Sequence, residues 1–170
     1  PSDAPELKNA KIYYMKALET SKEIDDKYWM MDWISFLIDI DFELALYDEM
    51  LYKIQELYEL AKNENDIYIQ GSVMMDYVRY YLEINNIEIA KKYYQKYYDL
   101  ISMENSIVYD YRDNNASKFY LELGDYEKAE SHIIKHMHRM LEKNDYSQAY
   151  RGLIWFYRDL GMIEKAIKYS

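Results

Sequence analysis

The sequence predicts an all-α protein built as a solenoid of antiparallel helix pairs. Three observations lead to this prediction. The chain of 170 residues contains only 4 Gly and 2 Pro, so few residues interrupt long helices. Half of the residues are hydrophobic, and over most of the chain they recur three or four positions apart, which is the period of an amphipathic helix. A short motif that ends in alanine also returns at intervals of 35–45 residues, which accommodate two helices and two turns.

The helical periodicity divides the chain into nine expected helices. In the second, Trp29, Trp33 and Phe36 share one face, and in the eighth Leu153 and Tyr157 do so. The expected helices span residues 5–22, 27–39, 42–62, 67–83, 86–103, 106–123, 125–143, 146–160 and 162–170.

The recurring motif is clearest at residues 124–129, Gly-Asp-Tyr-Glu-Lys-Ala, and it returns at residues 161–166. Weaker copies are expected at residues 5–10, 40–45 and 85–90. Where a copy begins with Gly or Asn, that residue can end one helix in the left-handed conformation, and an acidic or amide residue after it can cap the next. The alanine then permits two helices to approach closely. The expected close-approach positions are Ala10, Ala45, Ala90, Ala129 and Ala166.

The stretch Leu-Gly-Asp-Tyr-Glu-Lys-Ala at residues 123–129 resembles the signature of the tetratricopeptide repeat, and residues 10–17 resemble the second helix of such a repeat. The resemblance implies a right-handed superhelix in one repeat domain over residues 1–170. The implied repeats lie near residues 1–24, 25–64, 65–104, 105–144 and 145–170. The first and last of these are incomplete, so the chain is expected to be a fragment of a longer protein.

Composition excludes several classes of function. The 21 basic and 31 acidic residues give a net charge of −10, which argues against binding to a nucleic-acid backbone. The absence of cysteine excludes disulfides, thiolate catalysis and cysteine-bound metal. No run of 18 or more apolar residues exists, so we expect no membrane span and a cytoplasmic protein.

We expect no enzyme activity, no cofactor and no metal. His132 and His136 share a helix face and have the spacing to hold one metal ion, but no third ligand is evident, so we interpret them as ordinary histidines. The carboxylate pairs at residues 25–26 and at Asp39 with Asp41 are interpreted as helix-end residues rather than acid–base groups. The chain also lacks a phosphate-binding glycine loop and a nucleophile motif.

Tyrosine is unusually abundant, with 22 Tyr against 4 Phe, and it forms neighbouring pairs at 13–14, 80–81, 93–94 and 97–98. Adjacent helix positions point about 100° apart, so each pair is expected to place one ring inward and one toward a groove or solvent. Two explanations stay open here. One is a coding bias that fills core positions with Tyr, and the other is an aromatic binding surface.

The resemblance also implies where a ligand would bind, because the first helix of each pair lines the concave face of a tetratricopeptide array. The inward stripe is expected ten, six and three residues before each break. Its expected groove residues are Met75, Arg79, Asn114, Lys118, Arg151, Trp155 and Arg158. The same count from Ile40 gives an apolar floor of Met30, Ile34 and Leu37.

We therefore expect a non-catalytic scaffold that binds a protein or peptide in this groove. Its cations favour an acidic peptide or a free C-terminal carboxylate. The alternative is a regulatory or sensory array that controls a separate output domain, such as a nucleotide cyclase, a kinase or a DNA-binding domain. Both interpretations fit the sequence.

Overall fold

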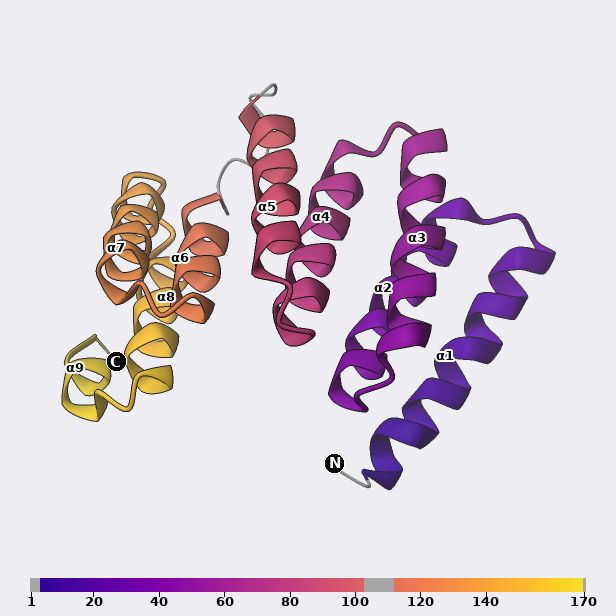
Figure 1. Cartoon of the computed structure of the whole chain (residues 1–170), viewed down its shortest axis with the longest axis horizontal. Coiled ribbons are helices and arrows are strands. Elements are labelled where there is room, and N and C mark those ends of the chain that lie inside the picture. The colour runs from indigo at the N-terminus through magenta and orange to yellow at the C-terminus, as the bar shows by residue number, and fades with distance from the viewer. Residues whose placement is uncertain (1–3, 103–111, 170) are drawn as a thin grey trace. The chain divides into compact units, whose positions relative to one another are not determined.

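A computed structural model describes residues 4–102 and 112–169, and in these ranges it contains nine α-helices and no strand (Figure 1). The all-α prediction is confirmed. The expected helix at residues 106–123 begins outside the described residues. The helices are α1 (Pro5–Glu23), α2 (Lys27–Glu43), α3 (Tyr47–Asn63), α4 (Ile67–Glu83), α5 (Ile87–Ser102), α6 (Arg112–Glu122), α7 (Tyr126–Glu142), α8 (Tyr146–Asp159) and α9 (Ile163–Tyr169).

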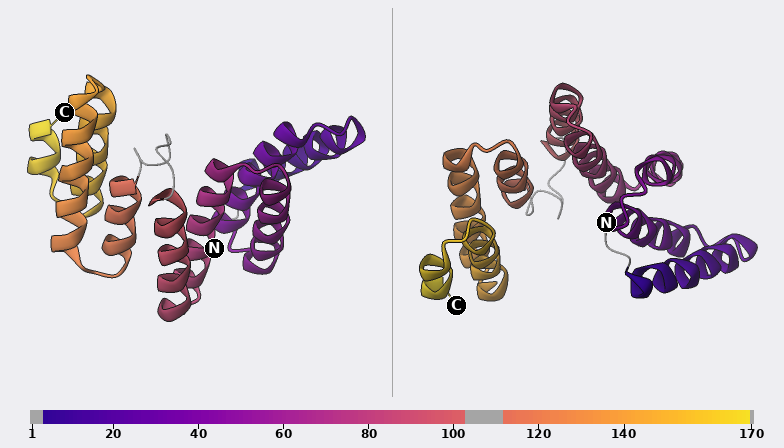
Figure 2. Two further views of the ribbon diagram at one scale, coloured as in Figure 1. Left: turned by 90° about the horizontal axis from the view of Figure 1, so that it is seen from above. Right: turned by 60° about the horizontal axis from the view of Figure 1, so that its bottom comes forward.

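The helices form two compact units, unit 1 (Pro1–Leu100) and unit 2 (Ile101–Ser170). Within each unit consecutive helices pack against one another: α1 on α2, α2 on α3 and α3 on α4 in unit 1, and α6 on α7, α7 on α8 and α8 on α9 in unit 2. This consecutive pairwise packing is the arrangement of an all-α solenoid, as the sequence predicts. The two views of Figure 2 show α1 at one edge of unit 1.

Every described turn between helices has the same three-residue form. The second residue of each turn has a positive φ, between 55° and 74°. The N–H of the third residue then donates to a carbonyl five residues earlier, as from Asp26 to Ser21 at 3.0 Å. This is the Schellman arrangement, which satisfies the last carbonyls of a helix. The left-handed residues are Asp25, Ala45, Asn65, Asn85, Gly124, Asn144 and Gly161.

The third residue of most turns also caps the following helix. The side chain of Asp26 accepts from the N–H of Trp29 at 3.1 Å, and Asp66, Asp125 and Asp145 cap α4, α7 and α8 in the same way. One residue thus closes one helix and opens the next, so the turns are short and the paired helices lie antiparallel.

The predicted break at residues 40–41 is wrong. Helix α2 continues to Glu43, and Ala45 occupies the left-handed position of the turn at φ 56° instead of a helix contact. The true break carries no Gly or Asn, so no local residue pattern marks it. In the corrected register Met50, which is fully buried, takes the place that alanine has in other pairs. Ile34 and Leu37, expected on the groove floor, are core residues with 0% and 1% exposure.

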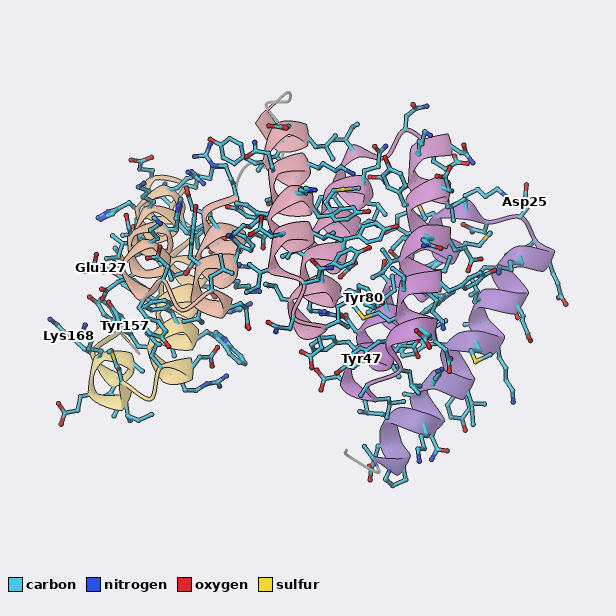
Figure 3. The ribbon with its side chains drawn as sticks, viewed as in Figure 1. Asp25, Tyr47, Tyr80, Glu127, Tyr157 and Lys168 are labelled. Atoms are coloured by element: carbon cyan, nitrogen blue, oxygen red, sulfur yellow. The ribbon has the colours of Figure 1, made fainter. Side chains whose placement is uncertain are left out.

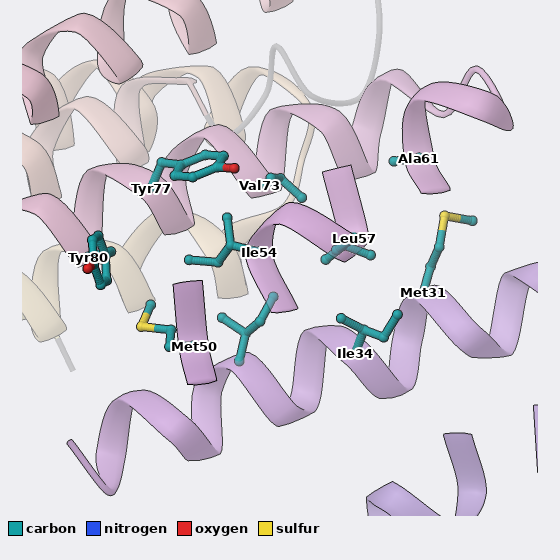
Figure 4. Close-up of a cluster of buried hydrophobic side chains, with 10 residues drawn as sticks. Met31, Ile34, Met50, Ile54, Leu57, Ala61, Val73, Tyr77 and Tyr80 are labelled. Carbon is teal, nitrogen blue, oxygen red and sulfur yellow. The ribbon is translucent and has the colours of Figure 1, made fainter. Parts of the chain in front are cut away.

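The core of unit 1 lies between α2, α3 and α4 (Figure 4). Met31, Ile34 and Ile38 of α2 face Ile54 and the other apolar residues of α3, and all of them are buried. Tyrosine rings extend this core: the ring of Tyr77 on α4 stacks on that of Tyr93 on α5 with centroids 4.3 Å apart. Core filling therefore accounts for part of the tyrosine content.

In unit 2 the core lies between α7, α8 and α9. Ala129 is fully buried, and Gly152 lets α8 approach α7 so closely that an added Cβ would lie 2.9 Å from Ile133 Cδ1. The Tyr157 hydroxyl (Figure 3) belongs to a residue of this core and donates to Glu130 at 2.7 Å. Small residues at helix contacts are thus used as the repeat pattern predicts, with Ala90 and Ala166 also buried.

Each unit also buries one carboxylate. Asp41 on α2 is completely buried and forms ion pairs with Lys11 of α1 at 2.7 Å and Lys53 of α3 at 2.6 Å. Asp41 therefore links α1, α2 and α3. Asp39 and Asp41 do lie near a helix end, but it is the C-terminal end of α2, so the expected interaction with an N-terminal helix dipole is wrong. In unit 2 the buried Asp113 of α6 links two helices, since it pairs with Arg139 and His132 of α7.

None of the helices in the described part of the chain combines the length and the apolar composition needed to cross a membrane.

Candidate functional site

The predicted groove residues of unit 1, Met75 and Arg79, lie on α4, and both are partly buried. Arg79 donates from Nη2 to Asp39 of α2 at 2.8 Å, and its guanidinium lies 4.3 Å from the ring centroid of Phe42. Asp39 and Phe42 stand six and three residues before Ala45. Counted from the true break at Ala45, Asp39 and Phe42 are therefore the expected inward residues of α2, and the count from Ile40 missed them. Arg79 is not a free cation, because one carboxylate and one aromatic ring already engage it.

A second acidic group, Asp76, lies on α4 one turn before Arg79. Burial raises the pKa of Asp76 on α4 to about 7. The positive charge of Arg79 lowers this pKa in part, and the negative charge of Asp39 raises it further. Arg79 is thus paired with Asp39 and also interacts electrostatically with Asp76. The expected attraction for an acidic ligand is weak on this unit.

The remaining predicted groove residues belong to unit 2. Asn114 and Lys118 lie on α6, and Arg151, Trp155 and Arg158 lie on α8. Both helices pack against α7. Lys118 is exposed, and it has no ion-pair partner within the residues that the structure describes.

On α8 the three predicted residues share one face, since they stand at positions i, i+4 and i+7. The guanidinium of Arg158 lies 3.6 Å from the ring centroid of Trp155, and that indole is 51% exposed. Arg151 makes one long contact, to Ser147 Oγ at 3.4 Å, and Arg158 lies 3.7 Å from Asp159. The face therefore presents two weakly engaged guanidinium groups beside an open aromatic ring.

The opposite face of α8 explains why this one is free. Ala149, Leu153 and Phe156 repeat the same spacing half a turn away, and all three are buried in unit 2. The apolar side of α8 is buried in the core of unit 2, and its side with Arg151, Trp155 and Arg158 faces solvent.

The two histidines weighed as metal ligands have other partners. His132 Nδ1 lies 2.9 Å from Asp113 Oδ1, and its ring stacks on Tyr120. His136 is buried beside the close approach of α7 and α8. Among the described residues no three His, Cys, Asp or Glu side chains come together in a metal-binding arrangement.

A tyrosine-lined pocket of about 260 Å³ lies between α3, α4 and α5. Tyr58, Tyr77 and Tyr93 form its aromatic walls, and Lys96 and Gln70 lie at its polar side. The stripe count missed it because it is lined partly by second helices. The abundance of tyrosine was its only signal in the sequence. Its volume is below the range typical of small-molecule sites, so it suits a single side chain rather than a cofactor.

Comparison with models of known protein families finds none that matches this chain, and comparison with curated proteins finds no significant relative.

Proposed function

We propose that this protein is a non-catalytic scaffold of the tetratricopeptide type that binds an acidic peptide segment on the outward face of unit 2. The supporting observation is the set of weakly engaged cations around an exposed indole: Arg151, Arg158 and Trp155 on α8, with Lys118 on α6. Arginine can grip a carboxylate through two parallel hydrogen bonds, and an exposed Trp beside it supplies apolar contact area. The amide of Asn114 adds a donor and an acceptor for a peptide backbone.

The charge balance of the whole chain makes this face selective. A protein with net charge −10 repels acidic ligands from most of its surface. A local excess of cations on unit 2 therefore gives an acidic peptide one place to bind. On unit 1 the equivalent cation, Arg79, is already paired with Asp39.

The test compares two double variants that change the net charge equally. Lys118→Glu with Arg151→Glu reverses two cations of the proposed face. Lys135→Glu with Lys168→Glu reverses two exposed cations of α7 and α9, away from it. Each protein is equilibrated with a fluorescent peptide pool rich in Asp and Glu and with a matched pool rich in Lys and Arg, and binding is followed by anisotropy.

We expect the wild type and the control variant to bind the acidic pool, and the K118E/R151E variant to lose this binding while circular dichroism shows unchanged helix content. Binding should also weaken as the Debye length falls from about 10 Å at 0.1 M salt to about 3 Å at 1 M. Equal binding of the acidic pool by both double variants would rule out this face.

A further inference from the structure

The helices of unit 1 repeat along the sequence, so equivalent positions can be compared. Helices α2 and α4 begin at Lys27 and Ile67, and α3 and α5 begin at Tyr47 and Ile87, so a shift of 40 residues superposes the sequence of α1–α3 on that of α3–α5. In each set a central helix has one helix before it and one after it. The tyrosine-lined pocket lies within the second set, so both of its flanking helices belong to the described chain.

In the first set an ion pair joins the two outer helices. Lys22 Nζ of α1 donates to Glu56 Oε1 of α3 at 2.8 Å. Under the shift these two residues correspond to Lys62 of α3 and Lys96 of α5. Two lysines repel each other and cannot form this bridge, and neither has an ion-pair partner among the residues that the structure describes. The second set therefore lacks a carboxylate at the position where the first set has one.

The apolar residues of the two central helices also differ. Ile34 and Leu37 of α2 are buried aliphatic residues of the first set. The corresponding residues of α4, Met74 and Tyr77, line the pocket of about 260 Å³. Aromatic rings that stack on one another thus stand around an open space in the second set, at positions where the first set packs aliphatic side chains.

Several hydrogen-bond donors around this pocket have no acceptor. Within the described part of the chain, the hydroxyl groups of Tyr58, Tyr77 and Tyr93 donate to no other residue. Burial, with a smaller contribution from the neighbouring phenols, raises the pKa of Tyr77 to about 12, so this hydroxyl keeps its proton at neutral pH. Lys96 Nζ lies 4.4 Å from the ring centroid of Tyr93 and brings a positive charge to the pocket wall. These groups favour a ligand that accepts hydrogen bonds and carries a negative charge.

We infer that this pocket binds a small monocarboxylate that carries one aromatic or aliphatic group. The apolar group lies among the tyrosine rings, and the carboxylate binds between Lys62 and Lys96, where it takes the place that Glu56 has in the first set. The volume of about 260 Å³ limits the apolar group to about the size of one side chain. A second negative charge would be repelled by Glu59 of α3, whose charge already acts on Tyr77.

The pocket is separate from the surfaces described above. On α4, Tyr77 and Arg79 are two positions apart and point to different sides of the helix. The pairing of Arg79 with Asp39, which weakens attraction for an acidic ligand on the groove side of α4, therefore does not act at the pocket. The peptide face proposed for unit 2 shares no residue with it.

The test uses 3-phenylpropionate as the probe. Its uncharged match is 3-phenylpropionamide, and acetate is the match without an apolar group. Isothermal titration measures the affinities. The protein is also labelled with carbon-13 at its methionine methyl groups, and the Met74 signal, assigned with Met74→Leu, reports in NMR spectra whether the pocket is the site of binding.

We expect 3-phenylpropionate to bind saturably and to shift the Met74 signal, and the amide and acetate to bind about tenfold more weakly or not at all. Lys96→Glu should abolish binding without lowering the Tm, because the new carboxylate can pair with Lys62 as Glu56 pairs with Lys22. Lys96→Gln, which cannot form that pair, should weaken binding by about tenfold. Lys16→Glu, at an exposed position of α1, changes the net charge as Lys96→Glu does and should bind as the wild type does.

Three outcomes would overturn the inference. They are equal binding of 3-phenylpropionate and its amide, unchanged affinity in both Lys96 variants, and binding that leaves the Met74 signal in place. The K118E/R151E variant should bind 3-phenylpropionate normally, so failure of the unit 2 proposal is seen separately.

The peptide acetyl-Gly-Gly-Phe distinguishes two sources of such a carboxylate. It carries the same ring and a carboxylate at the end of a chain. Tighter binding than that of 3-phenylpropionate would identify the C-terminal residue of a protein as the source, and weaker binding would identify a free small acid. Either result supports the assigned chemistry, provided that Lys96→Glu abolishes the binding.

Discussion

At the scale of single residues, the left-handed turn position fixes each helix boundary. Gly124 and Gly161 occupy it freely, and Asn65, Asn85 and Asn144 tolerate it because a short polar side chain can bond to the local backbone. Ala45 has neither advantage at φ 56°. Its methyl group crowds the following carbonyl, so this turn holds local strain that the flanking helices must offset.

Replacing Ala45 with glycine should relieve this strain. We expect Ala45→Gly to stabilise the protein by about 0.5–1 kcal/mol, since the relief exceeds the greater chain entropy of glycine in the unfolded state. Ala10→Gly, in the interior of α1, is the matched control and should destabilise by up to about 1 kcal/mol. Urea denaturation midpoints of both variants test this. A loss of stability in Ala45→Gly would contradict the strain argument.

Asp76 gives a pH dependence whose sign follows from its raised pKa. The folded-state value of about 7 lies above the unfolded value of about 3.9, so the folded state holds the proton more tightly. Its contribution to stability is therefore complete below about pH 4 and is lost as the pH rises through about 7. The carboxylate form is the costly one because burial withdraws it from water, and the charge of Asp39 adds to this cost.

Asp76→Asn cannot ionise and should remove this cost. We expect the variant to gain stability over the wild type at pH 8 and to differ little from it at pH 4. Thermal melts at several pH values measure the difference. Asp99→Asn, at an exposed position of α5, controls for the general effect of losing one negative charge. A stability gain that is the same at pH 4 and pH 8 would show that Asp76 does not titrate as proposed.

At the scale of elements, the sequence was sufficient wherever local chemistry marks a helix end. Glycine or asparagine followed by an acidic or amide residue places the turns at 85–86 and 124–125 correctly, and the buried Ala90 and Ala129 follow from them. The end of α2 failed because Asp41 looks like a cap. Only the lysines of two neighbouring helices show that its charge is neutralised inside the unit. Such a contact is tertiary and has no local signal.

The candidate site was predictable to the same extent. The face of α8 follows from helical spacing within one element, and Arg151, Trp155 and Arg158 lie there as counted. The partner of Arg79 did not follow, because Asp39 lies one repeat earlier in a register that was displaced by five residues. Spacing alone predicts which side chains share a helix face, but it does not predict which charges cancel across helices.

The close-approach alanines make the repeat register testable. Ala90 and Ala129 are completely buried, so leucine at either position has no space and should cost about 1–3 kcal/mol. Ala10→Leu, where the side chain is only partly buried, should cost less. Chemical denaturation of the three variants provides the comparison. If Ala90→Leu and Ala129→Leu unfold at the wild-type midpoint, these positions are not helix contacts.

At the scale of the whole molecule, two kinds of electrostatics act in opposite directions. The buried carboxylates Asp41 and Asp113 are held by cations at short range, and salt screens such pairs weakly. The remaining excess of 31 acidic over 21 basic residues produces a long-range repulsion in the folded state, which salt screens strongly. Added salt should therefore stabilise the protein rather than weaken it.

We expect the Tm to rise when salt is increased from about 0.01 M to about 0.15 M, as the Debye length falls from about 30 Å to about 8 Å. A gain of about 1 kcal/mol corresponds to about 2–4 °C for a chain of this size. The slope should depend on net charge. Lys135→Glu with Lys168→Glu takes the charge from −10 to −14, two units for each substitution, and should steepen the rise. Glu19→Lys with Glu142→Lys takes it to −6 and should flatten it. Calorimetry at matched pH measures all three slopes. If they are equal, the salt response comes from local ion pairs, and net repulsion does not limit the stability of this fold.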